Sequence, residues 1–291
     1  MRLIVILNGT QQKIRRFNKS WRAPLELQFD LDIRNTSYAG HAETLSRIAS
    51  EEKPDGILAA GGDGTLSQVV NGVMESGIKI PVGIVPLGTG NDFARLNRLS
   101  DPTNLIAAIK RGGEPTDVGC IEYEGNRKRY YMNVASLGMG PDVVRRLEHD
   151  SRWLGPDLTY LKSTVKSFFG YRPEEVAIHW HEREWTGTIR SVAVANGRTF
   201  GSGLTVAPEA EPDDGRLNLF VAGDVPLIQF LYFLGQIRLG KKVHHHKALY
   251  AVAENISIGS GEGIWIEADG ELVGKTPAKF SVLQGAIIFF R

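Results

Sequence analysis

The sequence of 291 residues has little cysteine, no clear excess of either charge and no long apolar run. Its one cysteine, Cys120, excludes an intrachain disulfide and a metal cage built of cysteines, and it predicts a reducing, cytoplasmic compartment. Lys and Arg number 34 against 33 Asp and Glu, a formal charge of +1. A protein that binds nucleic acid through counterion release carries a clear basic excess, so we expect no nucleic-acid partner.

The apolar segments are too short to cross a membrane. A transmembrane helix needs roughly 20 apolar residues, and the most apolar stretch, 225–239, is interrupted by Gln229, Gln236 and Arg238. The run from Leu3 to Leu7 is too short for the apolar core of a signal peptide, and we interpret it as a first β-strand. Hydrophobic residues make up 42% of the chain, which is enough for a sizeable core. The length predicts two domains.

Strand-like and helix-like segments alternate in the first third of the chain. The expected strands are Leu3–Leu7, Leu25–Leu31, Gly56–Ala60 and Pro81–Pro86, with helices including Ala42–Ala49 and Leu66–Met74. This alternation is typical of a parallel sheet covered by helices, whose ligands bind at the carboxyl ends of the strands. Three of the expected strands run into polar or glycine-rich turns at that end: 8–10, 61–65 and 87–92.

The pattern changes after about residue 116 to paired strands. We expect hairpins from Val118–Tyr123 with Tyr130–Val134 and from Glu175–His181 with Thr186–Ala195, and strands again over Phe280–Phe290. Two helical segments, near Asp157–Phe168 and over Val225–Leu239, interrupt this part. The predicted fold is α/β plus mostly antiparallel β, in two domains, 1–117 and 118–291.

The segment Gly61-Gly62-Asp63-Gly64-Thr65 joins an apolar strand to an amphipathic helix. A glycine-rich turn of this kind brings backbone amides and a helix N-terminus to phosphate oxygens. Asp63 would repel a phosphate unless Mg²⁺ lay between them, so it predicts a metal-nucleotide site. The alternative is a tight turn in which Thr65 caps the helix.

A second turn, Gly88-Thr89-Gly90-Asn91-Asp92, repeats this layout one strand later. Capping by Asn91 or Asp92 would explain its glycines, but not why both turns contain Thr and Asp. Two standard phosphate motifs are absent. The segment 235–242 has Walker spacing but lies in an apolar helix, and no G-x-G-x-x-G follows a strand.

Together, GGDGTLSQVVNG and PLGTGNDFAR resemble the diacylglycerol kinase catalytic family, specifically its bacterial soluble lipid kinases. The resemblance continues through 133–138, 193–197, 207–210, 213–215 and Asp269-Gly270-Glu271, and so covers essentially the whole chain. It implies an NAD-kinase-like three-layer α/β nucleotide domain and a β-sandwich-like second domain, with the C-terminal strand a candidate to return to the first domain.

The resemblance also implies roles for individual residues. Residues expected to hold ATP are Asn8, Thr10, Thr36, Gly61, Gly62, Asp63, Gly64, Thr65, Leu66, Ser67 and Thr89, with Asn8-Gly9 standing where the family usually has Asn-Pro. Glu271 is the expected base for the attacking hydroxyl, although Asp269-Gly270 alone would suit an ordinary hairpin turn. Asp269 would lie near Asp63 and Asp92, and the three carboxylates would organise the catalytic Mg²⁺.

The segment 211–216 resembles a structural Mg²⁺ loop of bacterial members. Its side-chain ligand would be Asp214, with the backbone carbonyls of Glu211 and Arg216. The alternative is a plain turn before the strand that starts at Leu217.

A basic cluster follows the apolar segment 225–239. It contains Arg238, Lys241, Lys242, His244, His245, His246 and Lys247. An apolar face ending in cations suits an anionic lipid surface, but a core helix with a cationic C-terminal cap is equally compatible. The histidine spacing gives no zinc signature.

We therefore predict an ATP- and Mg²⁺-dependent kinase that acts on a lipid hydroxyl of a diacylglycerol-like or phosphatidylglycerol-like acceptor. The expected location is the cytoplasm, at the inner membrane face when lipid is bound. The alternatives are an NAD kinase and a catalytically silent lipid or nucleotide sensor. The oligomeric state is left open, with a homodimer as one alternative.

Overall fold

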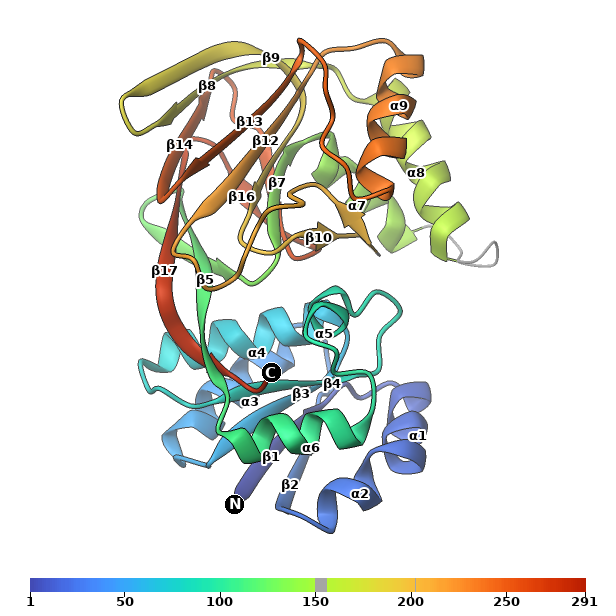
Figure 1. Ribbon diagram of the computed structural model, residues 1–291, viewed down its shortest axis with the longest axis vertical. Coiled ribbons are helices and arrows are strands. Elements are labelled where there is room, and N and C mark those ends of the chain that lie inside the picture. The colour runs from blue at the N-terminus through green and yellow to red at the C-terminus, as the bar shows by residue number, and fades with distance from the viewer. Residues whose placement is uncertain (150–155, 202) are drawn as a thin grey trace. The chain divides into compact units, whose positions relative to one another are not determined.

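The computed structural model describes residues 1–149, 156–201 and 203–291. They form two compact units, Met1–Asp117 with Gln284–Arg291, and Val118–Leu283. Each is described by itself (Figure 1). No helix among the described residues is long and apolar enough to cross a membrane.

The first unit is a parallel sheet between two layers of helices. Its elements are β1 (Arg2–Leu7), α1 (Gln11–Ser20), α2 (Arg22–Glu26), β2 (Asp30–Asn35), α3 (His41–Glu51), β3 (Gly56–Gly61), α4 (Asp63–Ser76), β4 (Val82–Pro86), α5 (Asp92–Leu96) and α6 (Pro102–Arg111). The strands pair in parallel in the order β4-β3-β1-β2. Helices α3 and α4 lie on one face and α2 and α6 on the other (Figure 1). The predicted three-layer α/β domain is confirmed.

The expected strand over Leu25–Leu31 is wrong. Residues Arg22–Glu26 form the short helix α2, and strand pairing starts at Asp30, opposite Arg2. Pro24 fits the first turn of a helix, where its missing N–H has no partner to lose. Leu25 is buried while Leu27 is 81% exposed, which is helix packing and not a buried strand.

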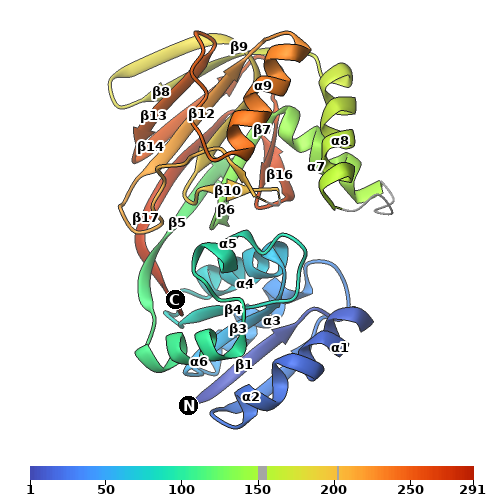
Figure 2. The same ribbon diagram turned by 45° about the vertical axis from the view of Figure 1, so that its right-hand side comes forward.

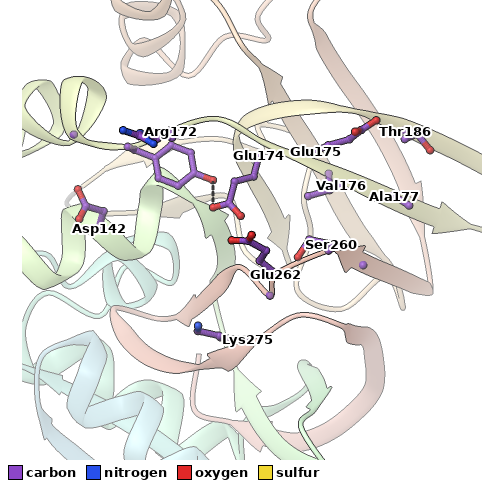
Figure 3. A pocket seen from close by; sticks show the side chains of 15 residues that line it. Asp142, Arg172, Glu174, Glu175, Val176, Ala177, Thr186, Ser260, Glu262 and Lys275 are labelled. Carbon is purple, nitrogen blue, oxygen red and sulfur yellow. Dashed lines mark hydrogen bonds between the residues drawn. The ribbon is translucent and has the colours of Figure 1, made fainter.

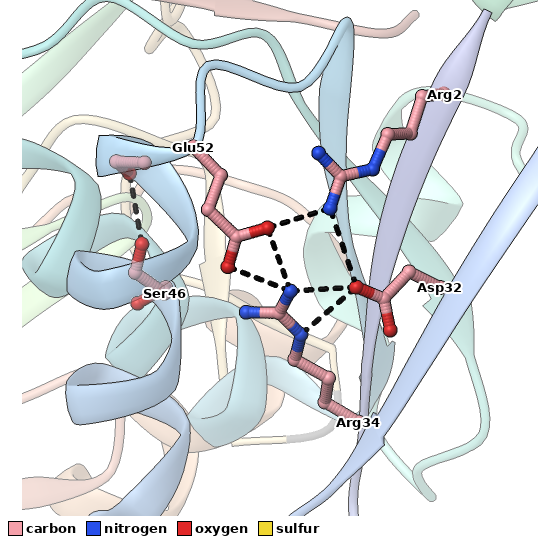
Figure 4. Close-up of polar contacts among 6 residues, drawn as sticks. Arg2, Asp32, Arg34, Ser46 and Glu52 are labelled. Atoms are coloured by element: carbon pink, nitrogen blue, oxygen red, sulfur yellow. Dashed lines mark hydrogen bonds and ion pairs between the residues drawn. The ribbon is translucent and has the colours of Figure 1, made fainter.

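A network of ion pairs ties the outer strand β2 to its neighbours (Figure 4). A guanidinium nitrogen of Arg34 lies 2.6 Å from Oδ2 of Asp32 and 2.7 Å from Oε1 of Glu52, and Arg2 on β1 also reaches Glu52. The hydrogen bond from Arg34 is the main reason that the pKa of Asp32 is lowered. The network joins β1 and β2 to Glu52, the residue directly after α3.

The second unit is mostly antiparallel β. Its elements are β6 (Arg127–Tyr131), β7 (Val134–Gly138), α7 (Met139–His149), α8 (Pro156–Gly170), β8 (Glu174–Trp180), β9 (Arg183–Ala195), β10 (Thr199–Phe200), β11 (Leu204–Thr205), β12 (Leu217–Gly223), α9 (Leu227–Arg238), β13 (Ala248–Ala253), β14 (Asn255–Ser260), β15 (Trp265–Ala268) and β16 (Glu271–Lys275). One core fills the space between strands, and a second packs α7, α8 and α9 against β7, β9 and β12. Among the described residues of this unit, three helices interrupt the strands instead of the expected two, because α7 was not predicted.

Two strands run through both units. β5 (Glu114–Tyr123) leads from the first into the second, and β17 (Ala278–Phe289) returns. β17 pairs antiparallel with β14 at one end, and at the other Phe289 pairs with Val82 of β4. The expected return of the C-terminal strand to the first domain is confirmed, and it is one long strand instead of several.

Candidate functional site

The carboxyl ends of four parallel strands bring the predicted nucleotide-binding residues to one edge of the first unit. The residues that follow β1, β2, β3 and β4 are, in that order, Asn8 and Thr10; Thr36; Gly62 to Ser67; and Thr89 with Asp92. Because the strands are parallel and adjacent, these segments share an edge. The first unit therefore assembles all of the residues that the sequence assigns to ATP.

The two glycine-rich loops are packed directly against each other. The amides of Leu87 and Gly88 both donate to the carbonyl oxygen of Gly61, at 2.7 and 3.0 Å. A Cβ atom on Gly88 would lie 2.5 Å from Cα of Gly62, closer than real contacts allow. Asn91, with a φ of +51°, completes the loop, since its side chain accepts from the amide of Gly88 and donates to the carbonyl of that residue. Glycine is thus required here by the approach of two backbones.

Helix α4 starts within the first glycine loop. Its N-cap is Gly62, which has no side chain to accept from the first-turn amides. A Cβ at Gly64 would meet no atom within 4 Å, so the helix start faces open space. First-turn amides and the helix dipole favour an anion at this position. The arrangement fits the phosphates of ATP.

Three residues of the loop and helix face inward. Thr65 is nearly buried, and its Oγ1 lies 3.5 Å from Nδ2 of Asn8. Leu66 and Ser67 are buried, and Ser67 Oγ has no hydrogen-bond partner among the described residues. Contacts from Leu66 and Ser67 to a nucleotide would therefore run through their backbone.

The first loop and the residue after β2 are joined. The amide of Gly9 donates to Oγ1 of Thr36 at 2.9 Å, and a Cβ on Gly9 would lie 1.9 Å from the carbonyl oxygen of Thr36. Glycine at position 9 therefore allows Asn8 and Thr10 to lie beside Thr36.

Two carboxylates stand at this edge. Oδ1 of Asp63, in the first turn of α4, accepts from the amide of Phe93 at 3.3 Å, which places it beside the first turn of α5. Asp92, only 6% exposed, opens α5 and pairs with Arg95 at 3.2 Å. Carboxylate oxygens are hard ligands of the kind that Mg²⁺ prefers.

The remaining predicted catalytic residues lie on a tight hairpin of the second unit. Asp269 and Gly270 have φ values of +48° and +88° and connect β15 to β16, as expected for a two-residue turn. The Asp269 carboxylate accepts from the amides of Met132, Asn133 and Val134 at 2.7, 2.9 and 3.2 Å. These bonds fasten the turn to the start of β7. The expected proximity of Asp269 to Asp63 and Asp92 joins two units and stays a prediction.

Glu271 follows the turn and is held by an arginine. Its Oε2 accepts from a guanidinium nitrogen of Arg129 on β6 at 2.6 Å, and its side chain is 31% exposed. The carboxylate is thus held in one orientation while it remains accessible.

A third carboxylate, Glu267, lies buried beneath the turn. Its Oε1 is 2.7 Å from Oγ of Ser136 on β7, and its Oε2 accepts from the amide of Gly270 at 3.0 Å. Burial raises the pKa of Glu267 to about 7, well above its ordinary value. The turn is therefore held from below by a group that titrates near neutral pH.

Sequence reasoning missed both Arg129 and Glu267. Arg129 is 142 positions from Glu271, and no local pattern links them. Glu267 pairs across strands with Ser136, which is equally remote in the chain. A local signal existed only for Glu267, as an acidic residue within an apolar strand two residues before an Asp-Gly turn.

The predicted structural metal loop lies between β11 and β12. Oδ1 of Asp214 accepts from the amide of Arg216 at 2.9 Å, and Glu211 is 3.8 Å from Arg198. All three predicted ligand residues are exposed. Within the described part of the chain, no three His, Cys, Asp or Glu side chains cluster closely enough to hold a metal ion. The predicted loop needs only one carboxylate and two carbonyl oxygens, which are donors suited to Mg²⁺.

A cavity of about 920 Å³ opens on the second unit, away from these residues. Its lining is polar: the Tyr171 hydroxyl donates to Oε1 of Glu174 at 3.5 Å, and Figure 3 shows Glu262 beside Glu174. None of the residues predicted to bind ATP or Mg²⁺ or to act in catalysis lines it.

Two family models match the two halves of the chain. The family described as "Diacylglycerol kinase catalytic domain" matches residues 2–121, and "YegS C-terminal NAD kinase beta sandwich-like domain" matches residues 134–291. The diacylglycerol kinase of Staphylococcus carnosus is 28% identical over 261 residues, covering 88% of this chain and 83% of that protein. A Pseudomonas aeruginosa protein named "Probable lipid kinase YegS-like" is 26% identical over 291 residues, covering 98% and 93%.

A solved structure shares the fold. The crystal structure of a diacylglycerol kinase from Bacillus anthracis strain Sterne superposes with a TM-score of 0.74 at 21% identity, covering 99% of this chain and 96% of that one. With both halves of the chain matched in order and the glycine-rich edge in place, the chain belongs to the diacylglycerol kinase catalytic-domain family of lipid kinases.

Proposed function

We propose that this chain transfers the γ-phosphoryl group of ATP to the hydroxyl of a diacylglycerol-like or phosphatidylglycerol-like lipid, with Mg²⁺ as cofactor. The observation that carries the proposal is the strand-end edge of the first unit, where an uncapped helix start, several threonines and the carboxylates of Asp63 and Asp92 converge. Two relatives named diacylglycerol kinase or lipid kinase support the choice of a lipid acceptor.

Each part of this edge has a task in the proposed reaction. The first-turn amides of α4, with Thr36 and Thr89, bind the phosphates. Asp63 and Asp92 hold Mg²⁺, which neutralises charge on the phosphate oxygens when bound. Asn8 and Thr10 complete the nucleotide site.

Glu271 accepts the proton of the acceptor hydroxyl as that oxygen forms its bond to the γ-phosphorus. The bond from the γ-phosphorus to the bridging oxygen breaks, and ADP leaves with the electron pair. Arg129 fixes the orientation of the Glu271 carboxylate, and Asp269 fixes the turn that presents it.

The loop 211–216 is the second place where we propose that Mg²⁺ binds. We propose that Asp214, with the carbonyls of Glu211 and Arg216, binds a structural Mg²⁺. Asp214→Asn should then abolish a Mg²⁺-dependent rise in melting temperature measured without ATP, whereas Asp213→Asn keeps it. Equal melting temperatures with and without Mg²⁺ in the unsubstituted protein would contradict this site.

The proposed function is tested by ATP consumption with Mg²⁺ against a panel of lipids in mixed micelles, with NAD as a soluble acceptor. Asp63→Asn should abolish turnover, and Asp30→Asn, an exposed aspartate on β2, serves as the matched control. Turnover on NAD alone would make the protein an NAD kinase. ATP binding without consumption on any acceptor would make it a sensor.

A further inference from the structure

Helices α8 and α9 of the second unit expose large apolar side chains to solvent. Ile228 and Leu239, at either end of α9, are 83% and 68% exposed, and Phe169 near the end of α8 is 72% exposed. The exposed set is completed by Leu161, Leu231 and Tyr232. Single exposed apolar residues are ordinary, but a series along two helices indicates a surface that meets an apolar phase.

The two helices are neighbours. The rings of Phe168 on α8 and Phe230 on α9 lie 5.1 Å apart, and both belong to the core cluster beneath the helices. Both ribbon views place α8 and α9 on the same flank of this unit (Figures 1 and 2). With the inner faces used for the core, the exposed residues make up the outer faces of adjacent helices.

Along the parts of α8 and α9 whose side chains the structure describes, the charged residues all carry the same sign. Residues 225–247 contain no Asp or Glu but four Lys or Arg, and residues 159–170 contain Lys162 and Lys166 and no acid. Lys162, Lys166 and Lys241 are exposed, whereas Lys242 pairs with Glu209 and Lys247 bonds the carbonyl of Asp224. Apolar side chains bordered by exposed cations match a surface that is apolar inside and anionic outside.

We propose that the outer faces of α8 and α9 dock on an anionic lipid bilayer, with Phe169 and Ile228 inserted and Lys162, Lys166 and Lys241 facing the headgroups. The choice of a lipid surface as partner rests on the proposed function. The charge pattern argues against a second copy of this chain, because two such faces would oppose cations to cations. A bilayer suits both features, because its interior accepts the exposed apolar side chains and its anionic headgroups attract the exposed lysines.

The proposal is tested by co-sedimentation with vesicles of phosphatidylcholine alone and of phosphatidylcholine mixed with phosphatidylglycerol. We expect binding to the mixed vesicles that weakens in high salt. Ile228→Glu should lower the vesicle partition coefficient about tenfold or more, since burial of such a side chain contributes a factor of this order. Leu27→Glu introduces the same charge at an equally exposed leucine of the first unit and should bind as the unsubstituted protein does.

The electrostatic part has its own pair of variants. Lys166→Glu should lower the partition coefficient several-fold at low salt and little at high salt, whereas Lys79→Glu, an exposed lysine of the first unit, should change neither. Three results would overturn the proposal. They are no binding to the mixed vesicles, an equal fall of the partition coefficient for a variant and its control, and a dimer that Ile228→Glu dissociates.

Kinase turnover separates this proposal from the proposed function. With a short-chain acceptor dissolved as monomers, below its critical micelle concentration, no docking is needed and Ile228→Glu should keep the turnover of the unsubstituted protein. If no lipid is phosphorylated by either protein but vesicle binding still depends on Ile228, docking stands and the proposed reaction fails. If turnover is normal and vesicle binding does not depend on Ile228, the proposed reaction stands and the docking proposal fails.

Discussion

The glycine-rich edge of the first unit and the Asp269–Gly270 turn of the second hold their shapes by different means. At the edge, backbone packs on backbone: Gly62 and Gly88 touch, and the carbonyl of Gly61 takes two amides of the next loop. At the turn, carboxylates fix the backbone: Asp269 accepts hydrogen bonds from three amides, and Glu267 accepts one from the amide of Gly270.

The difference matches the task that we propose for each region. Phosphates are bound by backbone amides, so the loops must leave those amides free of side chains and fixed in place. A base must be one charged side chain in one orientation, so the turn below it uses directed bonds to charged groups. The edge should therefore be sensitive to added volume, and the turn to altered charge.

The largest expected effect is at the turn. Glu271→Gln keeps the shape of the side chain and an oxygen that can accept from Arg129, but it removes the base, and kcat should fall by roughly 10² to 10⁴. The KM for ATP should stay nearly constant. Steady-state kinetics with Glu262→Gln, an exposed acid of the same unit, as control checks this. Full turnover by a folded Glu271→Gln protein would remove Glu271 from the mechanism.

The volume sensitivity of the edge is tested by two glycines. Gly88→Ala places a methyl group 2.5 Å from Cα of Gly62 and should lower the free energy of unfolding by about 1 to 3 kcal/mol. Gly64→Ala meets no atom, improves helix propensity and should leave stability unchanged or higher, yet weaken ATP binding by intruding on the phosphates. Urea titration and calorimetry measure the two effects. Equal stability of both variants would contradict the close packing.

Charge sensitivity beneath the turn is tested by pH. The pKa of Glu267 is about 7 in the folded protein against an ordinary 4.5, so the unfolded chain loses its proton first as pH rises. The contribution of this group is full below about pH 4.5 and is lost as pH rises through 7, a change of about 3 kcal/mol.

Glu267→Gln removes that titration. Across this pH range its free energy of unfolding, from urea titrations, should therefore fall less than that of the unsubstituted protein. Parallel pH profiles for the two proteins would show that Glu267 ionises normally.

The smallest effect is expected where charges are paired near solvent. Arg34→Met breaks the network with Asp32 and Glu52, but such pairs contribute at most about 1 kcal/mol and are screened by salt. Unfolding at low and high salt measures this. If Arg34→Met lowered the free energy of unfolding as much as Gly88→Ala does, the ion pairs would be a main support of β2 in the sheet.

Local sequence patterns predicted the first unit well where a strand ends in a distinctive turn. The buried strands β1, β3 and β4 and the glycine loops follow from apolar runs and short-range turn chemistry. The failure at 25–31 came from reading four apolar residues as a strand, although Pro24 and the exposed Leu27 favour a helical turn.

Local sequence patterns do not predict contacts between residues that are far apart in the chain. The contact of Arg129 with Glu271 and the register of Ser136 with Glu267 depend on how β6, β7, β15 and β16 are brought together. Nothing in the residues around 129 or 136 indicates their partners. The acidic turn was therefore predicted, but the roles of Arg129 and Glu267 in holding it were not.

The long strand β17 has a consequence for how the chain is made. Phe289 and Phe290 are buried in the first unit, and Phe289 pairs with Val82, so nearly the whole second unit emerges from the ribosome before the first has its last strand. The sheet of the first unit is therefore complete only after β17 has been synthesised, although β1 to β4 lie within residues 2–86.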